Sequence, residues 1–553
     1  MSIINSKHLT SITSYLWPGY TEEASNFHVL LIALIVNVKR REHLDTWTLF
    51  EDRPEDFSSM FRRILSLILD RTLSTSLRTH LLSFLIHAFQ SLDCGIVRRE
   101  CAPLVSIAIW HNISTEKRRD SLLDQTTHLK KAWRASLKRY DAGDDAAKAR
   151  LRFERSWLYA LLVDFLGILY DDSSKPDQEL YCERFLEFVT DLQSQLPTRR
   201  YVNSLLRDIN LIPAIRLSPM FNAERNDLIR ELQNLLSHYT YFTIDDQTGA
   251  QLTRTEAYDR HCKNLAKLQR TALKYYKEKL TVLALSNYGA IENRDELAGL
   301  LEPLSDEELL DLVNRLDIRS SYPEDLALPV NRAFLLECLL SEFERKKTFQ
   351  ELAQKMGLTP TDLTLFDPSF QRSDEYDGSH PLALPKLNLQ YLSAGDFLWR
   401  ALILYRCEAF YGIRRDIEAA LRRVRPETNR NGQTHFAGFS KMAMPIPGVS
   451  ILEAVPALVG SDGPSLVRAE VSFDVRRLGE NVRKEWDSLR PDDVVFLLSI
   501  QPPNPEATNG DAPHTEQERL GVVAVRSAEV VRVQDDKGQQ IRNSGHGSGK
   551  RRI

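Results

Sequence analysis

The residues near the end of the chain show the pattern most suggestive of nucleotide chemistry. Residues 545–551 read Gly-His-Gly-Ser-Gly-Lys-Arg. A phosphate-binding P-loop needs Gly, four residues and then Gly-Lys-Ser/Thr, with a helix following. Here Ser544 stands at the first glycine position, Arg551 replaces the hydroxyl that would hold magnesium, and three residues follow Lys550. We therefore predict a disordered basic tail over residues 541–553 rather than a nucleotide site.

Other patterns that carry catalysis or metal binding are absent from the sequence. It contains no GxSxG, no HExxH and no GxGxxG between a strand and a helix. No CxxC occurs, and Cys94 and Cys101 have no nearby histidine or cysteine to complete a metal site. His28, His80 and His87 fall in helical stretches, where packing or capping roles are expected. We therefore expect no catalytic residue, no metal and no cofactor.

Pairs of arginines are the better candidates for binding, because the planar guanidinium donates two hydrogen bonds to one phosphate. Arg199-Arg200 is predicted to lie on a surface that binds a partner. A solvated helix face with compensation of the helix dipole explains the second group equally well, so both interpretations stay open. This second group, predicted to contact RNA, consists of Arg414, Arg415, Arg422, Arg423 and Arg425.

Length and composition are those of a globular protein. The chain has 553 residues, of which 42% are apolar and 27% charged, and this length predicts a few domains of ordinary size. Its 72 basic and 76 acidic residues give a net charge of −4, which argues against a chain that coats nucleic acid through bulk charge. The longest apolar run, Val29–Val38, is about half the roughly 20 residues of a membrane span, so no membrane contact is expected. Six scattered cysteines favour a reducing compartment.

The first two thirds of the chain show a helical pattern almost throughout. Apolar residues recur at steps of three and four, as at Phe57, Phe61 and Ile64, which is typical of one apolar helix face. Short polar or proline-bearing stretches separate such segments. We therefore predict a helical domain over residues 1–364, either an α-solenoid or a large irregular bundle. No fixed repeat period is readable.

A linker and one long helix are predicted next. Residues 365–392 combine Asp, Ser, Pro and Gly with a short extended stretch. Ser393 and Asp396 fit a capping box, and apolar residues then follow one side until Pro426 stops the helix. A helix over residues 393–426 would be about 45 Å long, which suits a strut.

The period changes to two in the last part of the chain, over residues 436–540. Residues 467–475 alternate apolar and polar side chains, while 494–500 and 522–533 read as further strands. Strands without helices between them predict a small antiparallel barrel or sandwich. Residues 1–375 hold 48 basic and 54 acidic residues, a net charge of −6, whereas residues 376–553 hold 24 and 22, a net charge of +2. On net charge alone, the helical part is expected to bind proteins rather than phosphate.

Five blocks of the sequence are distinctive. They are residues 14–25 (SYLWPGYTEEAS), 181–201 (YCERFLEFVTDLQSQLPTRRY), 244–253 (IDDQTGAQLT), 382–416 (LALPKLNLQYLSAGDFLWRALILYRCEAFYGIRRD) and 467–500. Together they strongly resemble the aquarius family of intron-binding spliceosomal proteins. The resemblance covers nearly the whole chain in order. It implies an armadillo-like helical solenoid, a stalk helix and a β-barrel, which in that family are followed by a superfamily 1 helicase core. It also implies a complex that contacts intronic RNA.

The sequence departs from the family in two respects. Its start lacks an opening helical segment, and it stops inside the barrel, before both RecA domains. No ATPase residue of the family therefore has a matching position here, and the barrel is expected to be incomplete.

The resemblance implies a nuclear pre-mRNA splicing factor of the intron-binding complex, which in this chain is not an enzyme but a protein-binding scaffold with weak RNA contact. Expected partners are spliceosomal proteins, including a tetratricopeptide-repeat scaffold, and intronic pre-mRNA. The alternatives are an RNA-dependent ATPase of superfamily 1 and a generic armadillo-like adaptor.

Overall fold

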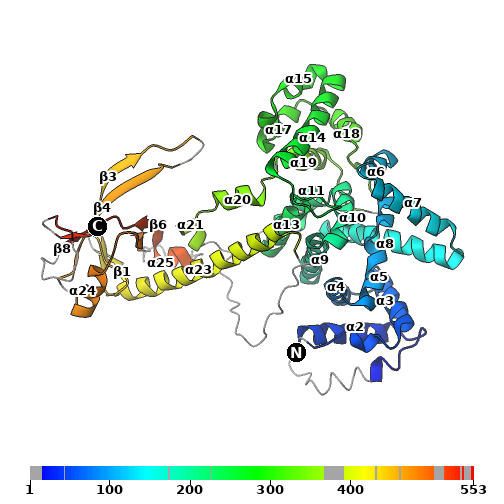
Figure 1. Cartoon of the computed structure of the whole chain (residues 1–553), viewed down its shortest axis with the longest axis horizontal. Helices are drawn as coiled ribbons and strands as arrows, with labels where there is room; N and C mark the ends of the chain where they lie inside the picture. The colour runs from blue at the N-terminus through cyan, green and yellow to red at the C-terminus, as the bar shows by residue number, and fades with distance from the viewer. Residues whose placement is uncertain are drawn as a thin grey trace. The chain divides into compact units, whose positions relative to one another are not determined.

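The computed structural model describes residues 15–42, 44–171, 175–223, 226–324, 326–366, 391–429, 433–459, 463–476, 478–502, 516–535, 538–540 and 550–553 (Figure 1). The chain forms two compact units. Unit 1 comprises Met1–Gln354 with Gly378–Trp399, and unit 2 comprises Lys355–Asp377 with Arg400–Ile553. Most of the linker expected over residues 365–392 lies outside the described residues.

Unit 1 is built from helices, as the periodicity of the sequence predicts. Its helices are α2 (Asn26–Arg41), α3 (Pro54–Ile68), α4 (Thr75–Phe89), α5 (Gly95–Cys101), α6 (Glu116–Leu123), α7 (Thr127–Asp141), α8 (Asp145–Leu169), α9 (Pro176–Ser194), α10 (Leu196–Asp208), α11 (Leu211–Arg216), α12 (Pro219–Asn222), α13 (Asp227–Thr240), α14 (Arg254–Tyr275), α15 (Lys277–Leu285), α16 (Tyr288–Ile291), α17 (Arg294–Leu301), α18 (Asp306–Arg315), α19 (Arg332–Phe343) and α20 (Phe349–Lys355). Three short 3₁₀ segments join them, η1 (Thr48–Phe50), η2 (Ala102–Val105) and η3 (Ile107–Asn112).

One continuous apolar core runs through unit 1. Phe57, Phe61 and Ile64 of α3 are fully buried, as their spacing predicts, and α8 and α9 pack against each other through Phe165 and Phe185, whose rings stack 4.1 Å apart. Burying side chains of this size stabilises the fold by about 1.5–3 kcal/mol each. The helices are thus held by packing of their apolar faces, while their polar faces remain available for other contacts.

Unit 2 combines small antiparallel sheets with short helices. Strands β1 (Pro426–Thr428) and β2 (Thr434–Phe436) pair, as do β5 (Val494–Ile500) and β6 (Val522–Glu529). A four-stranded sheet has the order β3 (Val449–Val455), β4 (Leu466–Asp474), β8 (Lys550–Arg552) and β7 (Gln534–Asp535). The unit also contains α21 (Asp362–Leu365), α24 (Glu480–Asp487) and α25 (Glu516–Leu520). Helices α24 and α25 correct the expectation that no helix separates the strands.

The end of the chain corrects a second expectation. Lys550–Arg552 forms β8, and the Ile553 and Val471 backbones exchange hydrogen bonds of 2.8 and 2.9 Å. Arg551 is 1% exposed and pairs with Asp487 on α24 at 2.6 Å. The prediction of a disordered tail is therefore wrong for residues 550–553, because strand pairing and a buried ion pair hold them. Residues 541–549 lie outside the described part of the chain.

The long helix is present as predicted, as α23 (Ala394–Val424) (Figure 1). Its first residues belong to unit 1 and the rest to unit 2. The apolar row expected along its whole length is buried only in the C-terminal half, where Phe410, Ile417 and Leu421 pack with Val525 of β6. Leu404, in the same row, is 70% exposed.

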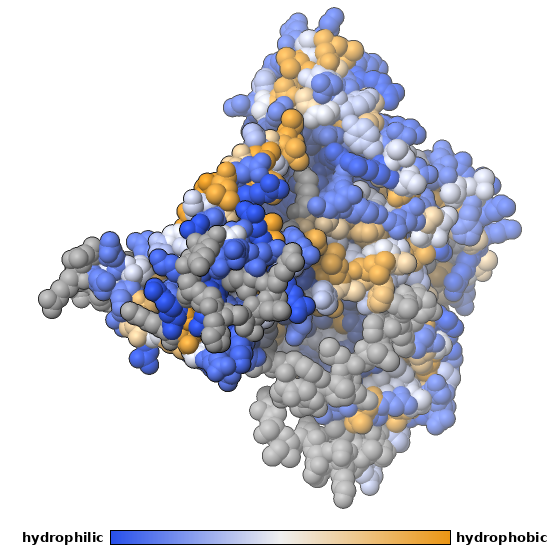
Figure 2. Space-filling model, turned by 60° about the vertical axis from the view of Figure 1, so that its left-hand side comes forward, coloured by the Kyte–Doolittle hydropathy of each residue, from blue (hydrophilic) through white to orange (hydrophobic). Residues whose placement is uncertain are grey.

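The surface is largely hydrophilic with separate apolar patches. Figure 2 shows orange side chains among blue ones at the top of the view, over the part of unit 1 where α15 lies. Val282 and Leu285 of α15 are 66% and 72% exposed. Within the described residues, no helix is both long and apolar enough to cross a membrane.

Candidate nucleic-acid interface

Four of the five arginines predicted to contact RNA are exposed near the C-terminal end of α23. Arg415, Arg422, Arg423 and Arg425 are all open to solvent. The guanidinium of Arg415 lies 5.7 Å from the ring centre of Tyr411, one helical turn earlier. This end of the helix therefore presents cations at its surface, as the sequence predicts, while contact with RNA stays a prediction.

Acidic residues compensate part of this charge. Arg414 is half-buried, and its Nε donates to Oε1 of Glu418 at 2.8 Å. Arg422 lies 4.0 Å from the other oxygen of Glu418. Asp416 is exposed on the same stretch of helix. The arginine group is thus a mixed surface with a modest excess of positive charge.

The end of α23 is fixed by backbone geometry. Arg425 adopts a left-handed conformation with φ of +48°, which ends the helix before Pro426. The Gly438 amide donates to the Val424 carbonyl at 2.9 Å. A Cβ at Gly438 would lie 2.0 Å from the Arg423 carbonyl oxygen, so only glycine permits this approach. These contacts tie the exposed arginines to the start of the sheets in unit 2.

Arg199 is not on the surface, and the prediction that it forms a partner-binding surface is wrong. Its side chain is 1% exposed. Its Nε donates to Oδ1 of Asp246 at 2.8 Å, and Nη1 donates to the side-chain oxygen of Gln193 at 3.1 Å and to the Tyr239 carbonyl. A buried guanidinium is tolerated only with such partners. Arg199 therefore holds α9, α10 and the segment after α13 together. We call this contact the Arg199 junction.

The loop that supplies Asp246 is shaped to reach α10. Gly249 has φ of +73°, and a Cβ there would lie 2.6 Å from Cδ2 of Leu196, so glycine meets both the backbone and the space requirement. Gln247 donates to the Arg200 carbonyl at 3.0 Å. Two of the sequence blocks that carry the family resemblance meet here. The Arg200 side chain itself is half-buried, and its role on a partner surface stays a prediction.

The first turn of α23 is anchored to the same part of unit 1. Ser393 Oγ accepts a hydrogen bond from the Asp396 amide at 3.2 Å, which confirms the predicted helix cap. The buried carboxylate of Asp396 accepts from the Leu392 amide at 3.1 Å and from the Tyr239 hydroxyl at 3.2 Å. Because the Tyr239 carbonyl accepts from Arg199, one residue links the Arg199 junction to the start of the long helix.

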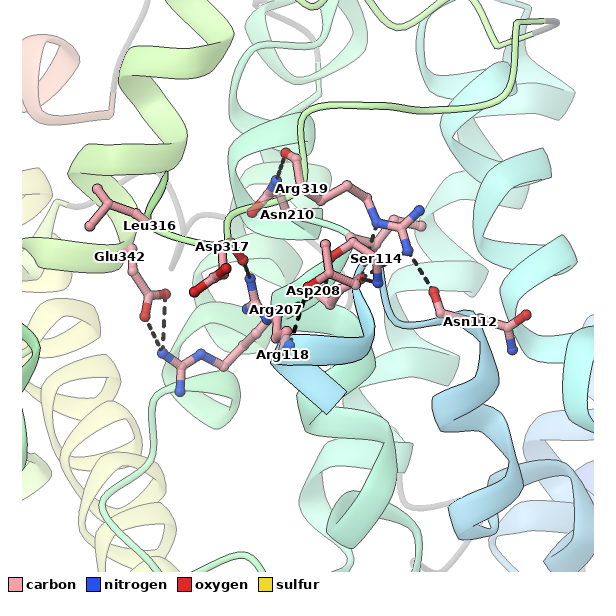
Figure 3. A network of polar contacts seen from close by, with 12 residues as sticks. Asn112, Ser114, Arg118, Arg207, Asp208, Asn210, Leu316, Asp317, Arg319 and Glu342 are labelled. Carbon is pink, nitrogen blue, oxygen red and sulfur yellow. Dashed lines mark hydrogen bonds and ion pairs between the residues drawn. The ribbon is translucent and has the colours of Figure 1, made fainter. Parts of the chain in front are cut away.

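A second polar network lies in unit 1 (Figure 3). Asp208, at the end of α10, is fully buried and accepts from Ser114 Oγ at 2.7 Å and from Arg319 Nε at 3.0 Å. Arg118 Nε lies 3.3 Å from the same carboxylate. Arg319 also donates to the Asn112 carbonyl at 2.5 Å. Two guanidinium groups thus share one buried carboxylate and join segments far apart in the chain.

The same network sets the position of Asp317, which follows α18. Arg118 donates to the Asp317 carbonyl at 2.7 Å. Asp317 has φ of +60°, a conformation that Asp tolerates better than most residues. Its carboxylate lies 3.0 Å from Lys117 Nζ on α6 and 3.2 Å from Lys267 Nζ on α14. Partial burial raises the pKa of this carboxyl, but the two lysines outweigh that effect and hold it below its ordinary value.

The residues of this network cannot be recognised from the sequence. Asp208 and Arg319 are 111 positions apart and are brought together only by the fold. No local pattern identifies such a pair. Within the described ranges, no three His, Cys, Asp or Glu side chains are placed to hold a metal ion.

Comparison with protein families matches two parts of the chain. Residues 3–347 match the family model described as intron-binding protein aquarius N-terminal. Residues 425–552 match the model described as intron-binding protein aquarius, beta-barrel. The first match corresponds to the helices of unit 1, and the second begins where α23 ends.

Two curated proteins are similar to the chain. RNA helicase aquarius of Mus musculus is 34% identical over 539 residues, which cover 96% of this chain and 36% of the mouse protein. Pre-mRNA-splicing factor cwf11 of Schizosaccharomyces pombe is 22% identical over 388 residues, 70% of this chain and 29% of the yeast protein. The chain thus spans about a third of the length of these relatives. With the N-terminal family model matching more than half of its residues, the chain belongs to the family of the intron-binding protein aquarius.

Proposed function

We propose that the chain acts in pre-mRNA splicing as a protein-binding scaffold of a nuclear, intron-binding spliceosomal complex. The observation that carries this proposal is the match of residues 3–347 to the aquarius N-terminal family. The name of the yeast relative, a pre-mRNA-splicing factor, supports the same process. The scaffold role is supported by the many helices of unit 1, since helical arrays offer long surfaces to other proteins.

The chain is proposed to work by binding rather than by catalysis. Lys550, the residue that would be the P-loop lysine, starts strand β8 and pairs with Asp474 of β4. A P-loop places its lysine at the start of a helix, where backbone amides cradle phosphate. We therefore expect no ATP turnover by this chain, with or without RNA. Turnover that is stimulated by RNA and abolished by Lys550→Ala would contradict this.

RNA contact is proposed at the exposed arginines of α23. Arg415, Arg422, Arg423 and Arg425 offer guanidinium groups that suit phosphate oxygens. The neighbouring Glu418 and Asp416 limit the excess charge, so this contact is expected to be weak and sensitive to salt.

The scaffold role is tested by affinity purification of the tagged full chain from nuclear extract, followed by mass spectrometry. The extract is divided, and one half is treated with ribonuclease before capture. Splicing proteins, including a tetratricopeptide-repeat scaffold, are expected in both halves. Their loss after ribonuclease would show that RNA, rather than a protein surface, holds the complex together. Capture of adaptor partners unrelated to splicing would instead favour a generic helical adaptor.

A further inference from the structure

Helix α14 carries a regular row of basic side chains that lies in unit 1, away from the arginines of α23 in the sequence. Because successive residues are about 100° apart around a helix, positions separated alternately by three and four residues stay within an arc of about 80°. The row extends over about 21 Å of helix. We call this the α14 basic row, and its members are Arg260, Lys263, Lys267, Arg270 and Lys274.

Packing of the opposite face determines which way the row points. Leu265, Leu268 and Ala272 of α14 are fully buried in the core of unit 1. On the flank, Asn264 Nδ2 donates to Glu342 Oε1 at 3.2 Å, and Gln269 Nε2 donates to the carbonyl of Ser286 at 2.7 Å. The helix therefore cannot rotate without breaking its core, and the basic face is held toward solvent.

Three of the five cations in the row are uncompensated. Lys263, Arg270 and Lys274 are exposed, and none of the acidic side chains in the described ranges lies within ion-pair distance of them. Arg260 lies 3.4 Å from Asp245, and Lys267 lies 3.2 Å from Asp317. Three cations of the row thus have no ion-pair partner among the described residues, while the exposed acids Glu256 and Asp259 stand at the N-terminal end of the same helix.

A sixth cation adjoins the middle of the row. Lys117 of α6 is 75% exposed and shares the Asp317 carboxylate with Lys267. One carboxylate between two ammonium groups leaves a net positive charge. The buried network of Figure 3 fixes this carboxylate through the contact of Arg118 with the Asp317 carbonyl, so the geometry is set before any ligand arrives.

We propose that the α14 basic row binds the phosphate backbone of RNA without reading its sequence. The side chains that border the row on the side of Glu342 are polar, Asn264 and Thr271. Cores of protein interfaces are depleted in lysine and enriched in aromatic and other apolar anchors. Lysine makes up three of the five members of the row, and the partly exposed Leu273 and Tyr275 flank its last member, Lys274. A polyphosphate backbone, in contrast, needs only a track of cations. The inference rests on this charge geometry and not on the splicing role.

The test compares two triple variants of the full chain that lose the same charge. Lys263→Ala with Arg270→Ala and Lys274→Ala removes the uncompensated members of the row. The control, Arg98→Ala with Arg134→Ala and Lys347→Ala, removes three exposed cations that lie on α5, on α7 and in the loop before α20 and have no ion-pair partner among the described residues. Circular dichroism and a thermal melt establish that both variants remain folded.

Binding is measured by fluorescence anisotropy with an oligouridine of about 15 nucleotides, at about 50 and 200 mM salt. Single-strand binding loses about 0.7 in the slope of log affinity against log salt per phosphate contact, so the row variant is expected to lower the slope by about 2. Over this salt range, its affinity should therefore fall about 20-fold less than that of the unaltered chain. The slope of the control variant should fall by no more than half as much as the slope of the row variant.

Two outcomes would overturn the proposal. Equal loss of slope in the row variant and in the control would show that total charge, not the row, determines binding. Displacement of the RNA by oligoglutamate of equal charge, at equal concentration, would show that the row fits an acidic protein segment as well as RNA. Neither outcome bears on the ribonuclease-resistant capture of splicing proteins, so the two proposals fail separately.

Discussion

Two arginine pairs that look alike in the sequence are used in opposite ways by the fold. Arg199, in the junction of unit 1, is buried and bonded to Asp246, Gln193 and Tyr239. Arg422 and Arg423, near the end of α23 in unit 2, are exposed. An adjacent pair of arginines thus indicates that strong cationic donors are present, but their use depends on whether another segment covers them.

The α14 basic row extends the comparison. Its members are single residues spaced by three and four, so they form no pair in the sequence, yet they share one exposed face. The arginines of α23 are adjacent, but Asp416 and Glu418 lie among them. Net charge is a poor guide to binding for the same reason. The net charge of −6 for residues 1–375 is a sum over the whole segment and hides the positive face of α14. The relevant quantity is the uncompensated charge on one face.

The largest effect is expected from removing the buried guanidinium. Arg199→Met should lower the unfolding free energy of unit 1 by about 3–5 kcal/mol, because it removes the cation that pairs with Asp246 and one donor to the Tyr239 carbonyl. Asp246 keeps its hydrogen bond from the uncharged Asn203 amide. Chemical denaturation of the full chain measures this. Arg200→Met, at the half-buried neighbour, should change stability by no more than about 0.5 kcal/mol.

A double variant sharpens this prediction. Adding Asp246→Asn to Arg199→Met removes the unpaired acid, so part of the lost stability should return. If Arg199→Met were no more destabilising than Arg200→Met, Arg199 would not have the structural role that its burial indicates.

The features that could be predicted from sequence are those set by local spacing. The bounds of α23 follow from the cap at Ser393 and the stop at Pro426, and β5 matches the apolar run of residues 494–500. Burial of Arg199 could not be predicted, because Asp246 is 47 positions away and reaches it only through the turn at Gly249. The position of β8 depends likewise on pairing with β4.

The α14 basic row can be predicted from the sequence, because its cations recur at helical spacing. Counting cations at helical spacing, rather than adjacent pairs, identifies residues 260–274 at once. The sequence does not show which of these cations are paired with acidic side chains. Only the fold shows that Arg260 and Lys267 contact acids from other segments, whereas Lys263 forms no ion pair among the described residues.

The second-largest effect is expected from removing three arginines of α23, and it allows the RNA binding of α23 and α14 to be compared directly. Arg415→Ala with Arg422→Ala and Arg423→Ala should weaken oligouridine binding, but less than the row variant does. Because Glu418 and Asp416 already offset part of this charge, the salt slope should fall by about 1 rather than about 2. A loss equal to that of the row variant would mean that both helices contact RNA to the same extent.

A change of similar size, but of opposite sign, is expected from removing the carboxylate that pairs with Lys267 of the row and with Lys117 beside it. Asp317→Asn removes the carboxylate shared by Lys117 and Lys267, and Asn tolerates the left-handed backbone at this position. The salt slope should steepen by about 0.7–1.4 as one or two more phosphate contacts form. Asp295→Asn, at an exposed acid on α17, changes the net charge equally and should leave the slope nearly unaltered. A gain of the same size in both would assign the effect to total charge.

The smallest effect is expected at Glu418, the acid that most directly offsets the charge of α23. Glu418→Gln removes one acidic neighbour of Arg422, whereas Arg414 stays half-buried, so the salt slope should steepen by no more than one phosphate contact contributes, about 0.7. Losing an ion pair at positions i and i+4 should cost about 0.3–0.5 kcal/mol of stability. Glu408→Gln, at an exposed acid on the same helix, serves as the control. If Glu418→Gln left RNA binding unchanged while the α23 triple variant weakened it, Arg415 and Arg423 would carry the contact. If the substitution reduced binding, Glu418 would be orienting Arg414 and Arg422 toward the phosphate rather than competing with it.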